Sequence, residues 1–293
     1  MSTLVILTLL VVLMLTGMPI SISLGLTVLS FLFLFTQVPI ESVALKLFTG
    51  IEKFEIMAIP FFILAGNFLT HGGVAHRMIR FASSMVGHLH GGLGLAGVLA
   101  CALFAAISGS SPATVVAIGS ILLPAMVKAG YPMRFGAGVV TTSGGLGILI
   151  PPSIAMIIYA VSTNTSIGAL FIAGVIPGIL LAFFLGMTTW YIARKNNYPR
   201  QPKASWGERW YAFRESFWGV LLIVIVMGGI YSGIFTPTEA AAVAAVYAFV
   251  VWAIHLAPQD DNHAMIDVSP LAGRDYPKTW VQFEDWFATE DAC

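Results

Sequence analysis

Charged residues are scarce in this sequence, and the first forty residues contain none. Asp, Glu, Lys and Arg make up 10% of the 293 residues, whereas 58% are apolar. Soluble domains contain about 25% charged residues, so this composition excludes a water-soluble globular protein. At about 20 residues for each crossing, the chain has room for roughly eight membrane segments. We therefore predict an all-α polytopic membrane protein.

Cysteine is nearly absent, and no catalytic pattern replaces it. Cys101 and Cys293 are the only two, which excludes a disulfide framework and a cysteine-based metal site. The histidines between residues 71 and 90 form two pairs, spaced five and two residues apart, and neither pair shares one helical face. The apolar part also lacks a phosphate loop, a nucleophile elbow and a carboxylate pair. We expect no catalytic residues, no transition-metal site and no enzyme activity.

The sequence begins with two apolar stretches, Ile6–Leu15 and Ile20–Phe35, joined by Gly17-Met18-Pro19. A signal peptide has a basic region before its apolar run and a small-residue cleavage site after it, and this pattern is not met here. We therefore expect a retained pair of membrane helices. Residues 37–55 mix charged and apolar side chains, as in an amphipathic arm that lies at the membrane interface.

The pattern over residues 56–88 predicts a re-entrant hairpin. Its first apolar stretch, Ile56–Leu69, has about 14 residues and contains Pro60, so it is too short to cross a bilayer. Gly72-Gly73 then precedes an amphipathic stretch. Asn67 is the one strongly polar side chain in the first arm. It either lines a binding site or locks the hairpin with a hydrogen bond.

The rest of the apolar part predicts further membrane helices and one cytoplasmic linker. Basic residues crowd residues 194–215, so the positive-inside rule places this linker in the cytoplasm. Thr236-Pro237-Thr238-Glu239 predicts a capping box, which explains Glu239 without a functional role. The predicted helices are Leu93–Ile107, Val115–Val127, Phe135–Ile150, Ile154–Val161, Ile167–Ile192, Phe217–Ile234 and Ala240–Ile254.

A first helix break is predicted at Ser108-Gly109-Ser110-Ser111-Pro112-Ala113-Thr114. Pro112 cannot continue a helix from upstream, but it can begin a new one with Ser111 as the N-cap. Carbonyls freed by a break need partners because hydrocarbon offers none. Unwound carbonyls that coordinate Na⁺ are a recurring feature of secondary transporters. The alternative is a kinked helix whose serine hydroxyls satisfy its own backbone.

A second break with the same chemistry is predicted at Thr141–Gly147, followed by Pro151-Pro152-Ser153. If the two breaks face each other, their hydroxyls and carbonyls could supply the oxygen ligands of a small cation. The glycines could instead only permit close helix packing. The candidate ion-binding residues are Asn67, Ser108, Gly109, Ser110, Ser111, Thr114, Gly144, Gly145 and Gly147.

Four segments resemble signatures of one family, the large membrane (M, DctM-type) subunit of tripartite ATP-independent periplasmic (TRAP) transporters. The resemblance covers about residues 1–253. The four segments occur in the order of that family, and they are Ile59–Asn67, Ser108–Thr114, Gly144–Ser153 and Gly233–Ala240.

This resemblance implies a Na⁺-driven importer of small organic acids, such as C4-dicarboxylates or sialic acids, in the bacterial inner membrane. It implies two partner proteins, a small membrane (Q) subunit and a periplasmic solute-binding (P) protein. The chain itself would lie in the lipid bilayer, and no nucleic-acid partner is implied. It also implies the first inverted repeat of an elevator-type fold, with a re-entrant hairpin and broken helices. The first repeat's Na⁺ region carries over to Ser108–Thr114 and its neighbour Ala65–Asn67, with Gly144–Pro151 as the second broken segment.

The sequence departs from the family after about Val251. Residues 1–257 hold 12 Lys/Arg and six Asp/Glu, whereas residues 258–293 hold two and eight. The segment Asp275–Cys293 resembles the start of zinc-ribbon transposases of insertion sequences. We therefore expect a subunit truncated after its first repeat and fused to a foreign tail. The alternative function is a transport-inactive remnant of the subunit.

Four parts are expected along the chain. Residues 1–55 form scaffold helices and the arm, and residues 56–165 form the transport part with the hairpin and the breaks. Residues 166–257 form a long helix, the linker and two further helices. Residues 258–293 form the acidic tail.

Overall fold

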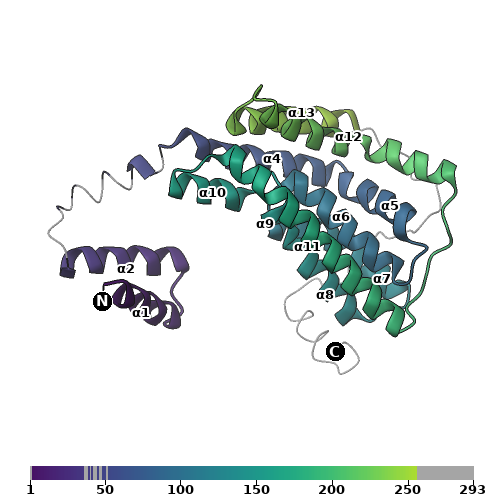
Figure 1. Ribbon diagram of the computed structural model, residues 1–293, viewed down its shortest axis with the longest axis horizontal. Coiled ribbons are helices and arrows are strands. Elements are labelled where there is room, and N and C mark those ends of the chain that lie inside the picture. Colours follow the sequence, from purple (N-terminus) through teal and green to yellow (C-terminus); the bar gives the residue numbers. More distant parts are fainter. Residues whose placement is uncertain are drawn as a thin grey trace. The chain divides into compact units, whose positions relative to one another are not determined.

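The computed structural model describes residues 2–35, 39, 41, 45, 48–50 and 52–255, and its regular elements within these residues are all helices (Figure 1). The predicted tail, residues 258–293, and much of the predicted arm, residues 37–55, lie outside the described residues. The chain divides into two compact units, one over residues 1–53 and one from Phe54 onward. Six described helical segments are long and apolar enough to cross a membrane. The chain is an all-α polytopic membrane protein.

The first unit is a helical pair, as the sequence predicts. Helices α1 (Ser2–Leu15) and α2 (Ile20–Phe35) pack against each other and are joined at Gly17, which has a φ of +80°. The Thr27 hydroxyl donates to the Ser23 carbonyl at 2.7 Å, one turn back in the same helix. A hydroxyl satisfied within its own helix suits a segment that faces hydrocarbon.

The second unit contains the remaining helices. In chain order they are η1 (Phe54–Met57), α4 (Ala58–His71), α5 (Val74–Val86), α6 (Gly92–Ser108), α7 (Ser111–Lys128), α8 (Met133–Gly144), α9 (Leu146–Leu149), α10 (Ile154–Thr163), α11 (Ile167–Lys195), α12 (Trp206–Tyr231) and α13 (Pro237–His255).

Three connections of this unit meet at one end, which we call the linker end. The amide of Gln201, in the linker between α11 and α12, donates to the carbonyl of Gly87 at 3.0 Å. The hydroxyl of Tyr131, between α7 and α8, donates to the carbonyl of Pro199 at 2.7 Å. The linker end therefore joins the α5–α6, α7–α8 and α11–α12 connections.

The hairpin predicted over residues 56–88 is wrong. The Phe54 carbonyl accepts a hydrogen bond from the Thr238 hydroxyl at the start of α13, whereas Gly87 lies at the linker end. Together η1 and α4 form an 18-residue segment, long enough to span. Gly73 has a φ of +70° and joins α4 to α5 without folding one arm onto the other.

Packing explains this course of α4 and α5. Helix α4 runs beside α13, and α5 lies against α6 and α12 (Figure 1). The apolar face of α5 is thereby covered by helices other than α4, so the two helices follow one another through the unit. On its polar side, Arg80 of α5 forms an ion pair with Glu215 of α12 at 2.8 Å.

The antiparallel helical hairpin lies instead at α6 and α7. Gly97 and Leu122, each about three turns from the connection between the two helices, lie in contact across the pair. Both outer ends of the hairpin are at the linker end, because α6 follows Gly87 and α7 precedes Tyr131. Its tip is the first predicted break, so the chain reverses there rather than continuing as a kinked helix.

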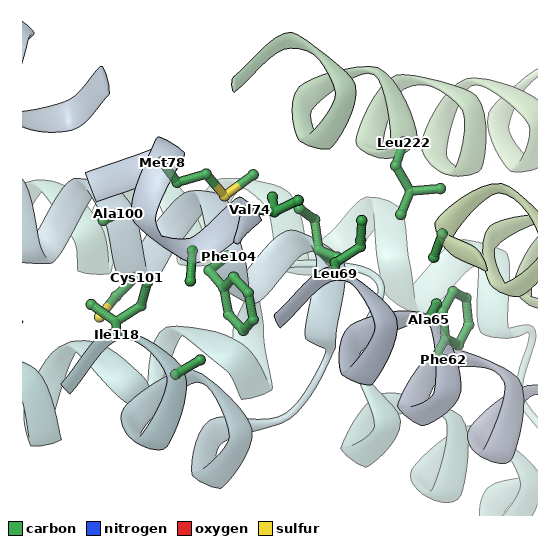
Figure 2. Close-up of a cluster of buried hydrophobic side chains, with 14 of the residues drawn as sticks. Phe62, Ala65, Leu69, Val74, Met78, Ala100, Cys101, Phe104, Ile118 and Leu222 are labelled. Atoms are coloured by element: carbon green, nitrogen blue, oxygen red, sulfur yellow. The ribbon is translucent and has the colours of Figure 1, made fainter. Parts of the chain in front are cut away.

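The core of the unit lies among α4, α5, α6, α7, α12 and α13, with contributions from α10 and α11. Figure 2 shows Phe62 and Leu69 of α4, Phe104 of α6 and Leu222 of α12 directed into one cluster. The Phe62, Leu69 and Phe104 side chains are fully buried. Since lipid is as apolar as these side chains, close packing of small and large residues holds such helices together. This packing fixes α4 against the α6–α7 hairpin.

The capping box at the start of α13 is confirmed. The Glu239 amide donates to the Thr236 hydroxyl at 3.3 Å, and the Glu239 carboxylate accepts from the Thr236 amide at 2.8 Å. A second capping box, between Ser205 and Glu208, begins α12. The sequence carries that signal too, as a serine three residues before a glutamate.

Loss of the α13 cap gives a testable prediction. Thr236→Ala is expected to lower the free energy of unfolding by about 1 kcal/mol, since an N-cap side chain contributes about that much. Chemical unfolding in detergent measures it. Thr188→Ala, which removes an exposed hydroxyl bonded to the Phe184 carbonyl of its own helix, is the matched control and should change little. A Thr236→Ala protein of unchanged stability would contradict a capping role.

Candidate functional site

The hairpin tip is built from backbone that leaves the helical conformation at two residues. Gly109 has a φ of +60°, which favours glycine, and Ser110 is extended. Ser110 is therefore the N-cap of α7, one residue earlier than predicted, and Pro112 follows within its first turn. The Ser110 carbonyl accepts from the Thr114 amide at 3.0 Å and from the Thr114 hydroxyl at 2.9 Å.

Two hydroxyls of the tip, those of Ser108 and Thr114, satisfy each other. Ser108 and Thr114 are buried, and their hydroxyl oxygens lie 2.9 Å apart across the reversal. The alternative that the serines satisfy their own backbone therefore applies to part of the tip. It leaves the Gly109 carbonyl, whose partner comes from a different segment.

The second break lies at residues 150–153, after the glycines at positions 144, 145 and 147 where it was expected. Gly145 is helical, so α8 passes into α9 with little interruption. The chain leaves the helical conformation at Ile150 and re-enters it after Ser153, the N-cap of α10. Proline explains this position, because Pro151 and Pro152 have no amide hydrogen to continue the helix.

The two breaks meet, as the sequence analysis required for a shared site. The Ile154 amide donates to the Gly109 carbonyl at 3.0 Å. A Cβ atom on Gly147 would lie 2.8 Å from the backbone carbon of Ser110, so only glycine allows this approach. A Cβ on Gly66 of α4 would lie 3.4 Å from the Cα atom of Ser108. Three segments thus converge on the hairpin tip.

The depth of this meeting point follows from its neighbour α11. Ala193 of α11 packs on Gly91 at the linker end, and Gly178 packs on Ile150 at the second break. At 1.5 Å per residue, the breaks lie about 22 Å from the linker end and about 16 Å from the first residue of α11. The meeting point is therefore well inside the membrane-crossing length of the bundle.

Two hydroxyls beside the meeting point are buried and have no hydrogen-bond partner. Ser143, near the end of α8, and Ser153, at the second break, are each 0% exposed. Ser153 occupies an N-cap position without capping the helix. A buried polar group without a partner costs about 1–3 kcal/mol. The arrangement therefore favours a ligand that these oxygens could bind.

Sequence reasoning did not select these two serines as candidates, although both belong to the predicted break. The only signal for them was a hydroxyl within the Thr141–Gly147 and Pro151–Ser153 segments. Whether a hydroxyl is satisfied depends on what lies across from it, which the sequence does not show.

Most of the predicted site residues lie at the meeting of the two breaks. Ser108, Gly109, Ser110, Ser111, Thr114, Gly144 and Gly147 lie at or against the meeting of the two breaks. Gly145 belongs to the same helical stretch, with its amide bonded to the Thr142 carbonyl at 3.2 Å. The Asn67 side chain is exposed, and its neighbour Gly66 is the residue that contacts the tip.

The chemistry of the meeting point is that of neutral oxygen atoms. Among the described residues no group of three or more His, Cys, Asp or Glu side chains could hold a metal ion. Neutral hydroxyl and carbonyl oxygens that are shielded from water suit a monovalent cation, because divalent ions in proteins are usually bound by carboxylates. Similar helix breaks hold Na⁺ in secondary transporters.

Comparison with known proteins agrees with this architecture. The family "Tripartite ATP-independent periplasmic transporter, DctM component" matches residues 7–265, which extends beyond the resemblance drawn from the motifs. The C4-dicarboxylate TRAP transporter large permease protein DctM of Rhodobacter capsulatus is 71% identical over 265 residues, covering 86% of this chain and 60% of the relative. The protein of the same description from Pseudomonas aeruginosa is 56% identical, covering 78% of this chain and 54% of the relative.

More distant relatives are described as permeases for other substrates. The sialic acid TRAP transporter large permease protein SiaM of Vibrio cholerae is 42% identical, covering 80% of this chain and 55% of the relative. This chain therefore spans about half to three-fifths of the length of these curated relatives. The family match covers most of the chain, and the chain belongs to the DctM component family of tripartite ATP-independent periplasmic transporters.

Proposed function

We propose that this chain forms the Na⁺-binding first repeat of a TRAP transporter's large permease. The observation that carries this proposal is the meeting of the two breaks beside the partnerless hydroxyls of Ser143 and Ser153. Na⁺ would bind where the Ser108–Thr114 tip and the Gly144–Ser153 segment converge. The bound ion would replace the hydrogen-bond partners that these buried oxygens lack.

The substrate we propose is a C4-dicarboxylate. Relatives described as C4-dicarboxylate permeases are 71%, 56% and 54% identical to this chain, whereas the sialic acid permease is 42% identical. Transport would require a small membrane subunit and a periplasmic binding protein in the bacterial inner membrane. The basic segment 194–215, predicted as a linker, consists of the end of α11, the shorter linker 196–205 and the first turns of α12, and it would lie on the cytoplasmic side.

Coupling follows from the way the breaks are held together. The hairpin tip is hydrogen-bonded to the second break and packs on α8 and α9, so it would move together with them. An elevator motion of these elements would carry the ion with the substrate past a scaffold. Binding of Na⁺ would favour the closed meeting of the breaks, and a ligand can shift such an equilibrium only by its difference in affinity for the two states.

Uptake by reconstituted protein tests this function. The full chain, with a matched small membrane subunit and binding protein, should take up a radiolabelled C4-dicarboxylate in proteoliposomes when a Na⁺ gradient is applied. A matched K⁺ gradient is the control and should give background uptake. Uptake that is equal in the two gradients would contradict Na⁺ coupling.

The alternative is a transport-inactive remnant of the subunit; the chain spans 60% of the length of the Rhodobacter capsulatus relative. The same assay separates the two proposals when the remaining part of that relative is supplied as a second polypeptide. Uptake only in the presence of the second polypeptide would show that this chain alone is inactive in transport. Uptake without it would contradict that alternative.

A further inference from the structure

A cluster of basic side chains lies at the linker end, away from the meeting of the breaks. The Arg200 guanidinium contacts the imidazole of His90. Ala193 of α11 packs on Gly91, which places the next residue, Arg194, close to the same ring. We call His90, Arg194 and Arg200 the basic cluster. The three residues come from the α5–α6 connection, the end of α11 and the linker.

The linker holds Arg200 in a defined place. Pro199 and Gln201, on either side of it, bond through their backbones to Tyr131 and Gly87 respectively. An arginine whose backbone is fixed between two such bonds loses less conformational entropy when it binds a ligand than one on a free loop. The backbone that carries Arg200 in the basic cluster is therefore preorganised for binding.

The nearby carboxylates are occupied elsewhere. Glu208 accepts from the Ser205 amide at 2.6 Å, and Glu215 pairs with Arg80 at 2.8 Å. No described carboxylate forms an ion pair with the basic cluster. Loss of hydration and the positive charges of Arg200 and Arg194 lower the pKa of His90. Arg194 and Arg200 thus place two positive charges beside His90, and an anion bound between them would compensate these charges.

Exposed aromatic rings place the cluster at the level of lipid headgroups. Trp206 is 84% exposed and Trp210 68%, both in the first turns of α12. The Arg194 guanidinium lies 5.2 Å from the ring centre of Trp190, and Arg209 lies 5.8 Å from that of Trp206. Tryptophan is enriched at membrane–water interfaces, so the basic cluster lies where phosphates of the bilayer are found.

A purely structural role explains only part of the cluster. Arg194 lies in the last turn of α11, where the helix dipole favours a positive charge. Arg200 lies outside any helix, and it is held against another basic side chain. The helix dipole therefore does not account for Arg200 and His90.

We propose that the basic cluster binds the phosphate of an anionic phospholipid such as phosphatidylglycerol. Arg200 and Arg194 would donate to its phosphate oxygens, and His90 would contribute a third donor. Guanidinium groups suit this task because their planar donors match phosphate oxygens in pairs. The site would anchor the α5–α6 and α11–α12 connections to the bilayer, independently of Na⁺.

Native mass spectrometry of the full chain in detergent tests the proposal. Added phosphatidylglycerol should bind in preference to phosphatidylcholine. Because Arg200 would donate directly to the phosphate, Arg200→Gln should weaken phosphatidylglycerol binding about fivefold, which corresponds to the loss of about 1 kcal/mol for one hydrogen bond. Arg194→Gln combined with Arg200→Gln should weaken it about 25-fold, with phosphatidylcholine binding unchanged.

The controls separate a built site from general charge and from free phosphate. Lys203→Gln removes a positive charge from the same linker outside the cluster and should weaken binding less than twofold. An equal loss in Lys203→Gln and Arg200→Gln would overturn the proposal. So would competition by millimolar inorganic phosphate as strong as that by phosphatidylglycerol, because the site would then serve a soluble anion.

Discussion

Replacing Gly147 by alanine is expected to separate the two breaks and abolish the stabilisation of the protein by Na⁺. A Cβ atom there would lie 2.8 Å from the Ser110 carbon and 2.9 Å from the Ser111 nitrogen, and both are backbone atoms. Neither can rotate away, so α9 must move from the hairpin tip. Overpacking of this kind costs about 1–3 kcal/mol, although alanine itself favours a helix by about 1 kcal/mol over glycine.

Gly138→Ala is the matched control for this substitution. Gly138 lies in α8 of the same segment, and a Cβ atom there would meet nothing within 4 Å. It should leave stability unchanged or raise it by up to about 1 kcal/mol, and it should preserve the response to Na⁺. Thermal unfolding in NaCl and in choline chloride measures both variants. Equal Na⁺ stabilisation in Gly147→Ala and wild-type protein would contradict a site at the meeting of the breaks.

Composition and helix signals predicted much of the fold. The helices of the chain follow from apolar runs, and the α13 cap follows from Thr236 and Glu239 at capping-box spacing. These features depend on residues close together in the sequence. Local chemistry is sufficient for them, since propensity and capping act within one or two turns.

The direction of the chain after Gly73 could not be predicted in the same way. A Gly-Gly pair permits a reversal but does not require one. Gly73 adopts a positive φ, yet α5 finds its apolar partners on α6 and α12 rather than on α4. The true reversal at Gly109 has similar sequence chemistry. Long-range packing decided between the two positions.

The second break shows a related limit. Gly144 and Gly145 are weak helix formers, but Gly144 remains in α8, packed tightly against Val115 of α7, and Gly145 keeps helical dihedral angles. The break begins at Ile150, where two prolines remove the amide donors. Missing donors are decisive, whereas a low helix propensity is overridden by packing. The sequence thus predicted a break in this segment but centred it too early.

Substitution of Ser153 is expected to change stability in opposite directions with and without Na⁺. In choline chloride, Ser153→Ala should unfold at the same free energy or up to about 1 kcal/mol higher, because it removes a buried hydroxyl that has no partner. In saturating Na⁺ the wild-type protein should be the more stable. A polar group that contacts a charge contributes about 1.5–3 kcal/mol, so Na⁺ affinity should fall about tenfold or more.

A second buried serine separates this effect from ordinary loss of a hydroxyl. Ser216 of α12 is 1% exposed, and its hydroxyl donates to the Ala212 carbonyl at 3.0 Å. Ser216→Ala should change stability equally in both salts, because its partner is protein. A Ser153→Ala protein that behaves in the same way would show that Ser153 does not bind the ion. Since Na⁺ at 100 times its dissociation constant stabilises by about 2.7 kcal/mol, a titration of unfolding against Na⁺ resolves the two outcomes.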